Sequence, residues 1–441
     1  MEPKDADRSH GRLGTFARLL RDPLGVLDRI AARSDGTVVR LDLGPFRPYL
    51  VTRPEHVQHV LRDRAGTYPR EGMMWKPMRR LLGNGIAGEG EAWARHRRMV
   101  APAFSARHID GLVDGMAAAI VPAVEACRTD APIEVYAEMT RIVHRVIRRV
   151  FFSDRIPADD VDRLGTATTG ILGALASRMV LPFVPDSVPL PGDATYRRAT
   201  RTVDEVLLPV VREQRRRGGD EPDILTMLSQ ARDETGARLP DEQVRDDLIA
   251  LFAAGTESTA VALTWLWLVL DGQPAVADRL RTEVAEVVGA GPVRRGHLPA
   301  LRYTRMVLQE VLRLYPPGWL IPRTAVAADD LAGVPIRPGD TVLVSPYLTH
   351  RLPRYWDDPA RFDPERFTLD RSAGRHPGAY LPFGAGPHRC LGSHLFTVEA
   401  QLIVAAVLSR YRPRLVGTPS VRPRLGASLR PRQRVRLQLA A

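Results

Sequence analysis

The sequence predicts a mainly α-helical fold with a small β portion (α+β). Helical spacing of apolar residues dominates from about Trp93 to Tyr315. Alternating apolar residues predict short strands near 36–52 and again near 333–345. The 441 residues, 44% of them hydrophobic, can bury a large core, and no repeat or low-complexity linker divides them. We therefore expect a single domain over 1–441, with a short flexible N-terminus of about 1–12.

The elements follow one another in a simple order along the chain. The early strands are expected at 36–43 and 49–52, before the helical part begins. Val184–Gly192 contains three prolines, so it predicts a loop between two helices. The apolar run Leu248–Leu270 predicts a long buried helix that ends at Asp271 and Gly272. Short strands return in Val334–Val344.

The composition favours a soluble protein in a reducing compartment, which we expect to be the cytoplasm. Residues 1–10 are charged and lack the apolar core of a signal peptide. Leu248–Leu270 is long enough to span a membrane, but polar residues at its centre favour a buried core helix, so no stable membrane anchor is expected. Cys127 and Cys390 are the only cysteines, so the sequence has no disulfide framework. Cys127 lies in an alanine- and valine-rich run and is interpreted as core packing.

The net charge of +12 comes almost entirely from arginine. High basicity is one sign of nucleic-acid binding. The sequence shows no zinc-ligand spacing, aromatic ribonucleoprotein pattern or convincing basic recognition helix, so no nucleic-acid partner is expected. An acidic protein that docks on a basic surface is the more modest alternative.

A glycine-rich loop, Phe383–Gly392, presents Cys390 directly before an amphipathic run. The start of a helix favours a thiolate over a thiol, and flanking glycines let a flat ligand approach the backbone. A soft anionic sulfur of this kind suits iron. The alternative is a buried structural cysteine after a turn, but the spacing of Phe383, Gly386, Cys390 and Gly392 is more specific than a lone cysteine.

The long predicted helix carries an acid and hydroxyls at its centre, Glu257, Ser258 and Thr259. Such groups are costly to bury without partners. One interpretation is a proton relay in which the carboxylate and an alcohol deliver protons through water. The alternative is that Glu257 pairs with a core arginine while the hydroxyls bond to their own helix.

Two further pairs have helical spacing. Glu310 and Arg313 lie on one face and can form an ion pair, which Arg366 would join as a buried network. This is a structural element on either interpretation. Trp93 and Arg97 lie one turn apart and offer donors for carboxylates, although a solvated basic face is the alternative.

Together these motifs resemble the cytochrome P-450 family of haem-thiolate monooxygenases. The resemblance spans from the Trp93 helix to beyond Cys390, with the motifs in the family's order. It implies the P-450 fold, a haem b between the long central helix and the cysteine-loop helix, and Cys390 as the proximal iron ligand. It implies haem contacts from Trp93, Arg97, Arg323, Phe383, Gly386, His388 and Gly392, an acid–alcohol pair of Glu257 and Ser258, and a structural triad of Glu310, Arg313 and Arg366.

One departure from the family concerns the alcohol position, which is usually threonine and here is Ser258. Serine lacks the methyl group that restricts the rotamer. Proton delivery is then looser, or Thr259 shares the role.

The resemblance implies insertion of one oxygen atom from O2 into a hydrophobic small molecule. No flavin or iron–sulfur segment is present in this sequence, so electrons are expected from a ferredoxin and ferredoxin reductase, or from a flavodoxin-type donor. By family position the substrate pocket includes the mostly apolar residues Met74, Trp75, Phe252, Ala253, Trp319, Leu320 and Leu429.

The mostly apolar pocket favours a terpenoid or similar natural-product scaffold. A fatty acid or polyketide is the alternative, because Arg79 and Arg80 would hold a carboxylate. A non-catalytic haem-binding sensor or carrier is a further alternative, motivated by the serine at position 258.

Overall fold

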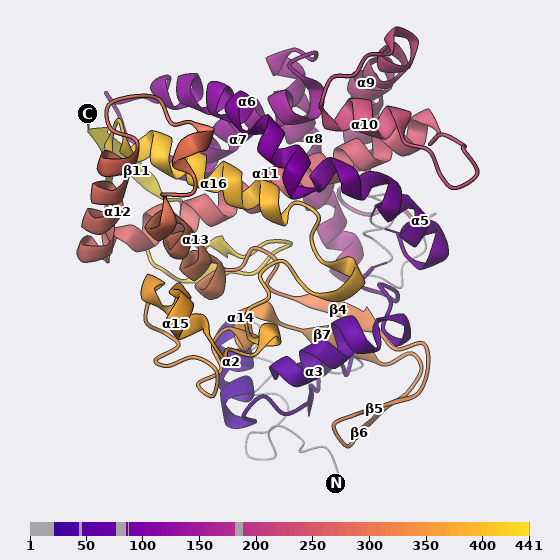
Figure 1. Cartoon of the computed structure of the whole chain (residues 1–441). Helices are drawn as coiled ribbons and strands as arrows, with labels where there is room; N and C mark the ends of the chain where they lie inside the picture. The colour runs from indigo at the N-terminus through magenta and orange to yellow at the C-terminus, as the bar shows by residue number, and fades with distance from the viewer. Residues whose placement is uncertain (1–21, 44–45, 76–84, 87, 181–187, 441) are drawn as a thin grey trace. The chain divides into compact units, whose positions relative to one another are not determined.

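The computed structural model describes the chain except for residues 1–21, 44–45, 76–84, 87, 181–187 and 441 (Figure 1). The expected flexible N-terminus, 1–12, lies outside the described residues. The chain divides into two compact units, each assembled from segments far apart in the sequence. Unit 1 comprises Met1–Trp75, Gln309–Cys390 and Arg424–Arg430, and unit 2 comprises Lys76–Leu308, Leu391–Pro423 and Pro431–Ala441. A single functional domain over 1–441 stays a prediction.

Unit 1 is built on a four-stranded sheet in the order β1–β2–β7–β4. The strands β2 and β7 run parallel, with Tyr49 opposite Val342, and the outer pairs are antiparallel. A separate hairpin joins β5 to β6. Both predicted strand regions are confirmed, and the structure adds that they pair with each other. The bounds are β1 (Val39–Arg40), β2 (Tyr49–Val51), β4 (Ile321–Thr324), β5 (Asp329–Leu331), β6 (Val334–Ile336) and β7 (Thr341–Val344).

Short helices surround this sheet. Several begin with proline in the first turn, where the missing N–H costs nothing. A π-helical turn, η1, follows α3 directly, and such turns are frequent at functional sites. The bounds are α2 (Pro23–Arg33), α3 (Pro54–Gln58), η1 (His59–Asp63), η2 (Ala65–Thr67), α14 (Pro346–Thr349), η5 (Pro364–Phe367), α15 (Leu369–Ser372), η6 (Pro377–Ala379) and η7 (Gly386–His388).

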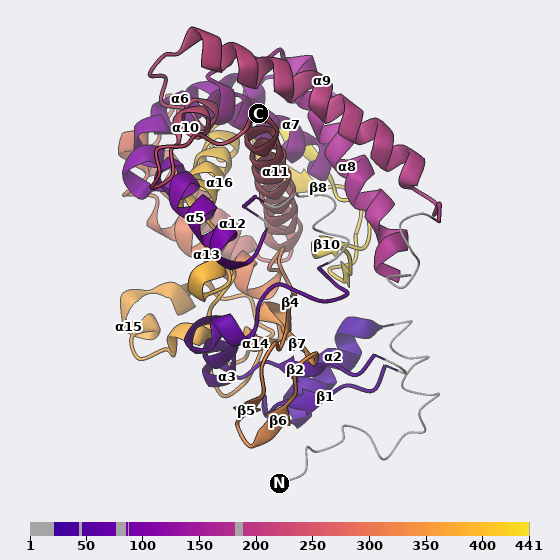
Figure 2. The same ribbon diagram turned by 90° about the vertical axis from the view of Figure 1, so that its right-hand side faces the viewer.

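Unit 2 is mainly helical. In it α11 packs against both α7 and α16, and α9 lies along α8 (Figures 1 and 2). The bounds are α5 (Gly90–Val100), η3 (Ala101–Phe104), α6 (Ala106–Glu125), α7 (Val135–Phe152), α8 (Ala158–Val180), α9 (Asp193–Arg217), α10 (Ile224–Gln230), α11 (Asp241–Asp271), α12 (Pro274–Val287), η4 (Arg295–His297) and α16 (Ser393–Leu408).

A three-stranded sheet in the order β3–β11–β8 completes unit 2. Its strands are β3 (Ile133–Glu134), β8 (Arg412–Leu415) and β11 (Arg436–Ala440). The helix α13 (Arg302–Leu314) begins in unit 2 and ends in unit 1, and β9 (Pro423–Arg424) and β10 (Arg430–Pro431) flank the last segment of unit 1.

The long central helix is confirmed as a buried core helix. It starts earlier than predicted, at Asp241, because Pro240 precedes it and acidic residues in its first turn suit the positive end of the helix dipole. It ends at Asp271, with Gly272 as the C-cap, as expected. Part of the predicted loop Val184–Gly192 lies outside the described residues, and 188–192 form no helix.

Two described helical segments are long and apolar enough to cross a membrane by length and composition. They are Asp241–Asp271 and Gly386–Leu408, and 72% and 67% of their most apolar windows are buried inside the protein. This burial is typical of core helices.

Candidate active site

Backbone hydrogen bonds within unit 1 close the cysteine loop on itself. The Cys390 amide donates to the Phe383 carbonyl at 2.9 Å, and the Arg389 amide donates to the Gly386 carbonyl at 3.1 Å. The Cys390 residue itself is exposed. The loop therefore holds the position of its cysteine without covering it.

Gly386 is required at its place in the loop for two reasons. Its φ of +68° lies in the left-handed region, which favours glycine. A Cβ atom there would lie 1.8 Å from the carbonyl oxygen of Leu61, in η1. The loop thus packs backbone against backbone, and only glycine allows this approach.

These residues fit a haem. An accessible sulfur at the end of a fixed glycine loop, just before the N-terminus of α16, is suited to a thiolate ligand of iron.

The structural triad is assembled in unit 1 as the helical spacing predicts. Arg313 donates to both carboxylate oxygens of Glu310, at 2.6 and 2.7 Å, and both side chains are fully buried. Arg366 lies 3.4 Å from the same carboxylate. Arg313 also donates to the carbonyls of His350 and Pro359, at 2.9 and 2.8 Å, so this guanidinium holds several chain segments together.

His350 connects this network to the cysteine loop, and sequence reasoning missed it. Its Nδ1 lies 3.0 Å from the Arg313 carbonyl, and its Nε2 accepts from the Leu381 amide at 2.9 Å. Because an amide only donates, Nε2 is unprotonated and Nδ1 carries the proton. Burial lowers the pKa of His350 to about 3. A neutral imidazole therefore joins α13 to the segment directly before the cysteine loop, and an isolated histidine in a sequence carries no signal of this role.

In unit 2, three consecutive side chains of α11 have three different environments. The Glu257 carboxylate accepts from the Tyr136 hydroxyl at 2.5 Å, and Tyr136 lies in the first turn of α7. Ser258 donates to the Ala254 carbonyl at 2.6 Å, as the alternative interpretation of the hydroxyls expected. Thr259 donates to Glu399 of α16 at 3.2 Å. Neighbouring positions differ by about 100° around a helix, so Thr259 and Ser258 lie on different faces.

A stripe of accessible residues crosses the middle of α11. Leu251, Ala254, Gly255 and Ser258 are exposed or half-buried, as are Ala253 and Glu257 beside them, whereas residues 247–250 and 259–270 are buried. The spacing of Leu251, Ala254, Gly255 and Ser258 places these four on one face. Ser258 therefore lies on the accessible face of the helix, and Thr259 is 2% exposed on the buried one.

Phe252, which the family position predicts for the substrate pocket, is buried. It is 1% exposed, and its ring lies 5.5 Å from that of His144 in α7. It is a core residue of unit 2, because α11 is apolar on several faces and its periodicity does not identify the exposed one. Ala253, the next residue, is half-buried.

The predicted haem-carboxylate donors are also placed. The Trp93 indole donates to the Ile86 carbonyl at 3.0 Å, and the Arg97 guanidinium lies 5.6 Å from the centre of its ring. Arg323, in β4, is 5% exposed and donates to the Pro322 carbonyl at 2.8 Å. His388 lies in η7 of the cysteine loop. The indole has a single N–H, so donation from Trp93 to a haem carboxylate requires exchange of its present bond.

Four of the predicted pocket residues lie in one apolar cluster of unit 1. Met74, Trp319 and Leu320 are partly buried against a core that includes Leu429. Leu429 is 0% exposed, so it belongs to the core of this cluster and does not reach the protein surface. The Trp75 indole donates to the Pro322 carbonyl at 3.0 Å. Arg79 and Arg80, the expected carboxylate-binding pair, lie outside the described residues.

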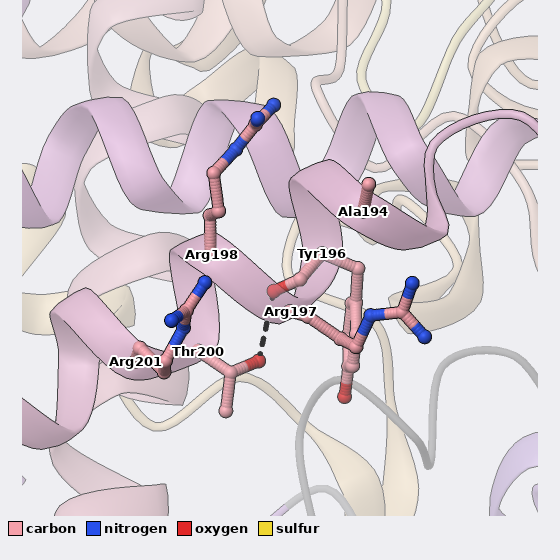
Figure 3. A pocket seen from close by; sticks show the side chains of 6 residues that line it. All are labelled: Ala194, Tyr196, Arg197, Arg198, Thr200 and Arg201. Carbon is pink, nitrogen blue, oxygen red and sulfur yellow. Dashed lines mark hydrogen bonds between the residues drawn. The ribbon is translucent and has the colours of Figure 1, made fainter.

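A basic hollow on α9 has no assigned role. All the residues that line it come from one helix, and its three arginines point in different directions (Figure 3). The dashed contact in the figure is the bond from the Thr200 hydroxyl to the Tyr196 carbonyl within the helix. An open helix face of this kind is a solvated surface. The lining residues are Ala194, Tyr196, Arg197, Arg198, Thr200 and Arg201.

Comparison with known proteins identifies the family. Residues 13–439 match the family profile described as Cytochrome P450. The chain is 34% identical to cyclooctat-9-en-7-ol 5-monooxygenase of Streptomyces melanosporofaciens, over 92% of this chain and 88% of that protein. It is 30% identical to pentalenene oxygenase of Streptomyces avermitilis, over 97% and 95% of the two chains.

The fold is also that of a solved structure. The crystal structure of the cytochrome P450DA heme domain superposes with a TM-score of 0.85, covering 99% of this chain and 97% of that one, at 23% identity. The motif order, the fold and the family match agree, and the chain belongs to the cytochrome P450 family.

Proposed function

We propose that this cytochrome P450 monooxygenase holds haem b through the Cys390 thiolate and inserts one oxygen atom from O2 into a terpenoid or a similar hydrophobic scaffold. The observation that carries the proposal is the accessible Cys390 at the end of a loop fixed by its own backbone. When bound, the haem supplies the iron at which dioxygen is activated. Arg97, Arg323 and His388 are the proposed donors to its carboxylates, with Trp93 beside Arg97.

Glu257 and Ser258 are proposed to deliver the protons that this reaction consumes. The Tyr136 hydroxyl holds the Glu257 carboxylate in one orientation, 2.5 Å away. The Ser258 hydroxyl lies on the accessible stripe of α11 and now donates to the Ala254 carbonyl. Ser258 must turn from that carbonyl to pass on a proton, and the absence of a β-methyl group makes this rotation easier than it is for threonine.

The substrate class is proposed from the relatives and from the apolar cluster. Cyclooctatin synthase of Streptomyces melanosporofaciens, 34% identical over 93% of this chain and 90% of that protein, joins the two relatives named above as enzymes of terpenoid modification. In unit 1, Met74, Trp319 and Leu320 present partly buried apolar surface. Such surface binds a hydrocarbon scaffold with few polar contacts.

Electrons are proposed to come from a ferredoxin and its reductase, with the enzyme in the cytoplasm. The net charge of +12 favours an acidic donor, which a basic surface attracts over a distance. The rate of reduction should then fall as ionic strength rises, because salt screens exposed charges. A rate that is insensitive to salt would argue against an acidic donor.

The test is spectroscopic and then chemical. The purified, reduced protein should give the strongly red-shifted absorption band of a thiolate-bound haem with carbon monoxide. Polycyclic terpenes should shift the resting haem spectrum, and a ferredoxin system should convert one of them to an oxygenated product. Absence of the red-shifted band in fresh protein would refute the haem-thiolate assignment. A normal band without product from terpenes, fatty acids or polyketides would favour the sensor or carrier.

A further inference from the structure

The π-helical turn η1 packs directly against the cysteine loop within unit 1. A Cβ atom on Gly386 would lie 1.8 Å from the Leu61 carbonyl oxygen and 3.1 Å from the Cα atom of Arg62. Leu61 is 2% exposed and belongs to a core cluster that Ala385 of the loop also contacts. Backbone packed this closely against backbone leaves no free space. A displacement of the turn would therefore displace the loop.

A π turn is a rare form of helix, and one carboxylate supports this one at both ends. The bond that closes the turn runs from the Arg64 amide to the His59 carbonyl at 2.8 Å. The side chains of the same two residues both meet Asp329 in β5. Nε2 of His59 lies 2.7 Å from Oδ2 of Asp329, and Nε of Arg64 lies 3.8 Å from Oδ1. Asp329 therefore joins the two residues that the π-helical bond joins.

Tyr68 is the third side chain at this carboxylate. It is 1% exposed, and its hydroxyl donates to Oδ2 of Asp329 at 2.7 Å. Burial and the bond to Asp329 raise the pKa of Tyr68, so the hydroxyl keeps its proton. Burial alone would raise the pKa of Asp329, but the bonds from His59 and Tyr68 outweigh it and lower this pKa. An ionised carboxylate only accepts, so Nε2 of His59 carries the proton in this contact.

The β5–β6 hairpin holds Asp329 in place. The hairpin lies beside α3, which leads directly into the turn (Figures 1 and 2). Asp329 pairs with Ile336 across the hairpin, and Ile336 and Leu331 belong to the same core cluster as Leu61. The Asp329 side chain is only 9% exposed. A carboxylate with so little exposure and two short hydrogen bonds is oriented more firmly than an exposed ion pair.

We propose that Asp329 is a positioning residue for the Cys390 thiolate. It fixes the π turn through the two end residues, His59 and Arg64, and the turn fixes the cysteine loop through its contact with Gly386. Asp329 thus acts on the iron ligand through two layers of packing. The effect on the thiolate rests on the proposed function, whereas the support of the turn by Asp329 does not.

Hydrogen exchange of the full-length, haem-loaded protein tests the support of the turn. The amides of residues 59–68 should exchange about tenfold faster in Asp329→Ala, the effect of losing a hydrogen bond to a charged group. Asp329→Asn keeps an acceptor oxygen for the same donors, so it should restore most of the protection. Asp330→Ala is the matched control in the same hairpin, because the Asp330 carboxylate accepts from the Gly333 amide at 2.7 Å. Unchanged exchange of 59–68 in Asp329→Ala would overturn the proposal.

The carbon monoxide spectrum tests the effect on the thiolate. In Asp329→Ala the red-shifted band should convert to the shorter-wavelength band of a haem without its thiolate bond about tenfold faster than in the wild type. Asp329→Asn should slow this conversion again, and Asp330→Ala should match the wild type. The reduction potential of the haem iron should change in Asp329→Ala alone, because contacts around the ligand sulfur set it. Equal conversion in the two alanine variants would indicate a general loosening of the hairpin and refute the positioning role.

Tyr68→Phe provides a second test if Asp329→Ala does not fold, since it removes one bond to the carboxylate and keeps the ring in the core. It should speed both the exchange of 59–68 and the loss of the red-shifted band by about threefold. Unchanged rates would count against the proposal. A missing red-shifted band in the wild type, with faster exchange in the variants, would refute the proposed function and leave the support of the turn intact.

Discussion

His350 in unit 1 and Glu399 in unit 2 are both buried titratable side chains, but their hydrogen bonding differs. His350 uses both ring nitrogens, one with the Arg313 carbonyl and one with the Leu381 amide. Glu399 uses one oxygen with Thr259 and leaves the other without a partner. The histidine is therefore a fixed connector, whereas the acid retains a free position for water and a proton.

The same contrast holds for the two parts of the candidate site. Backbone hydrogen bonds and the close approach of Gly386 to Leu61 fix the cysteine loop. In the acid–alcohol segment of α11, side-chain hydrogen bonds join Glu257 to the Tyr136 hydroxyl and the Thr259 hydroxyl to Glu399. Variants in unit 1 should therefore act on stability and cofactor retention, and variants on α11 should act on the rate of proton-coupled steps.

The largest expected effect is that of Cys390→Ser, which should abolish product formation and the red-shifted carbon monoxide band. Cys127→Ser is the matched control. Burial raises the pKa of Cys127 to about 12 and its thiol contacts Glu138 at 3.0 Å, so it is no thiolate and its loss should leave turnover unchanged. Equal loss in both variants would contradict the assignment of the ligand.

Arg313→Lys should destabilise the protein by about 3–5 kcal/mol, because an ammonium group cannot replace a guanidinium that serves a carboxylate and several carbonyls at once. Urea unfolding of the haem-loaded protein measures the loss of stability. The Arg313→Lys variant should also lose haem more readily than the wild type. Arg354→Lys is the control, since Arg354 lies 3.7 Å from Asp35 and both side chains are 59% exposed. Its cost should be at most about 1 kcal/mol. Similar costs for the two variants would contradict the view of unit 1 as a rigid frame.

Several of these features are predictable from sequence alone because they depend on local spacing. The cysteine loop, the pairing of Glu310 with Arg313 and the end of α11 at Gly272 all involve residues close in sequence. Their side chains meet through helix geometry or turn chemistry, which a short window of sequence contains.

The remaining features depend on packing between distant segments. Glu399 meets Thr259 across α16 and α11, and His350 meets Leu381 through a loop, so no local pattern marks either residue. Phe252 shows a second limit. A helix that is apolar on several faces gives no periodic signal for the face that lines a pocket.

His350 and Glu399 should make the stability of the protein depend on pH in opposite directions. The folded protein holds His350 neutral, with a pKa near 3 instead of 6.5, so this contribution to stability is lost as the pH falls from 6.5 toward 3. Glu399 keeps its proton in the folded state, with a pKa of about 8 instead of 4.5, so stability is lost as the pH rises from 4.5 toward 8. Each slope is at most about 1.4 kcal/mol per pH unit.

Glu399→Gln separates the two effects, because it removes only the second. Between pH 6.5 and 8 the unfolding free energy of the variant should decline less than that of the wild type, and below pH 6.5 the contribution of His350 should remain. Urea unfolding at a series of pH values measures the change in stability both above and below pH 6.5. Identical curves above pH 6.5 would show that Glu399 is already ionised there.

The smallest effect is expected for Tyr136→Phe, which removes the hydroxyl that donates to Glu257 and keeps the ring. A hydrogen bond to a charged group contributes about 1.5–3 kcal/mol, and water partly replaces it at this half-buried position, so product formation should slow by roughly fivefold. Binding of substrate should not change, because Tyr136 acts on Glu257 and not on the substrate. The solvent isotope effect should rise and more reduced oxygen should be released without product.

Tyr355→Phe is the matched control for this last test. Its hydroxyl donates to both oxygens of the Glu55 carboxylate, at 2.8 Å each, so the chemical change is the same, but the pair lies in unit 1. That variant should alter stability slightly and leave turnover and the isotope effect unchanged. A purely structural Tyr136 would behave like Tyr355. A rise in the isotope effect for Tyr136→Phe alone therefore places control of the proton at the hydroxyl that holds Glu257.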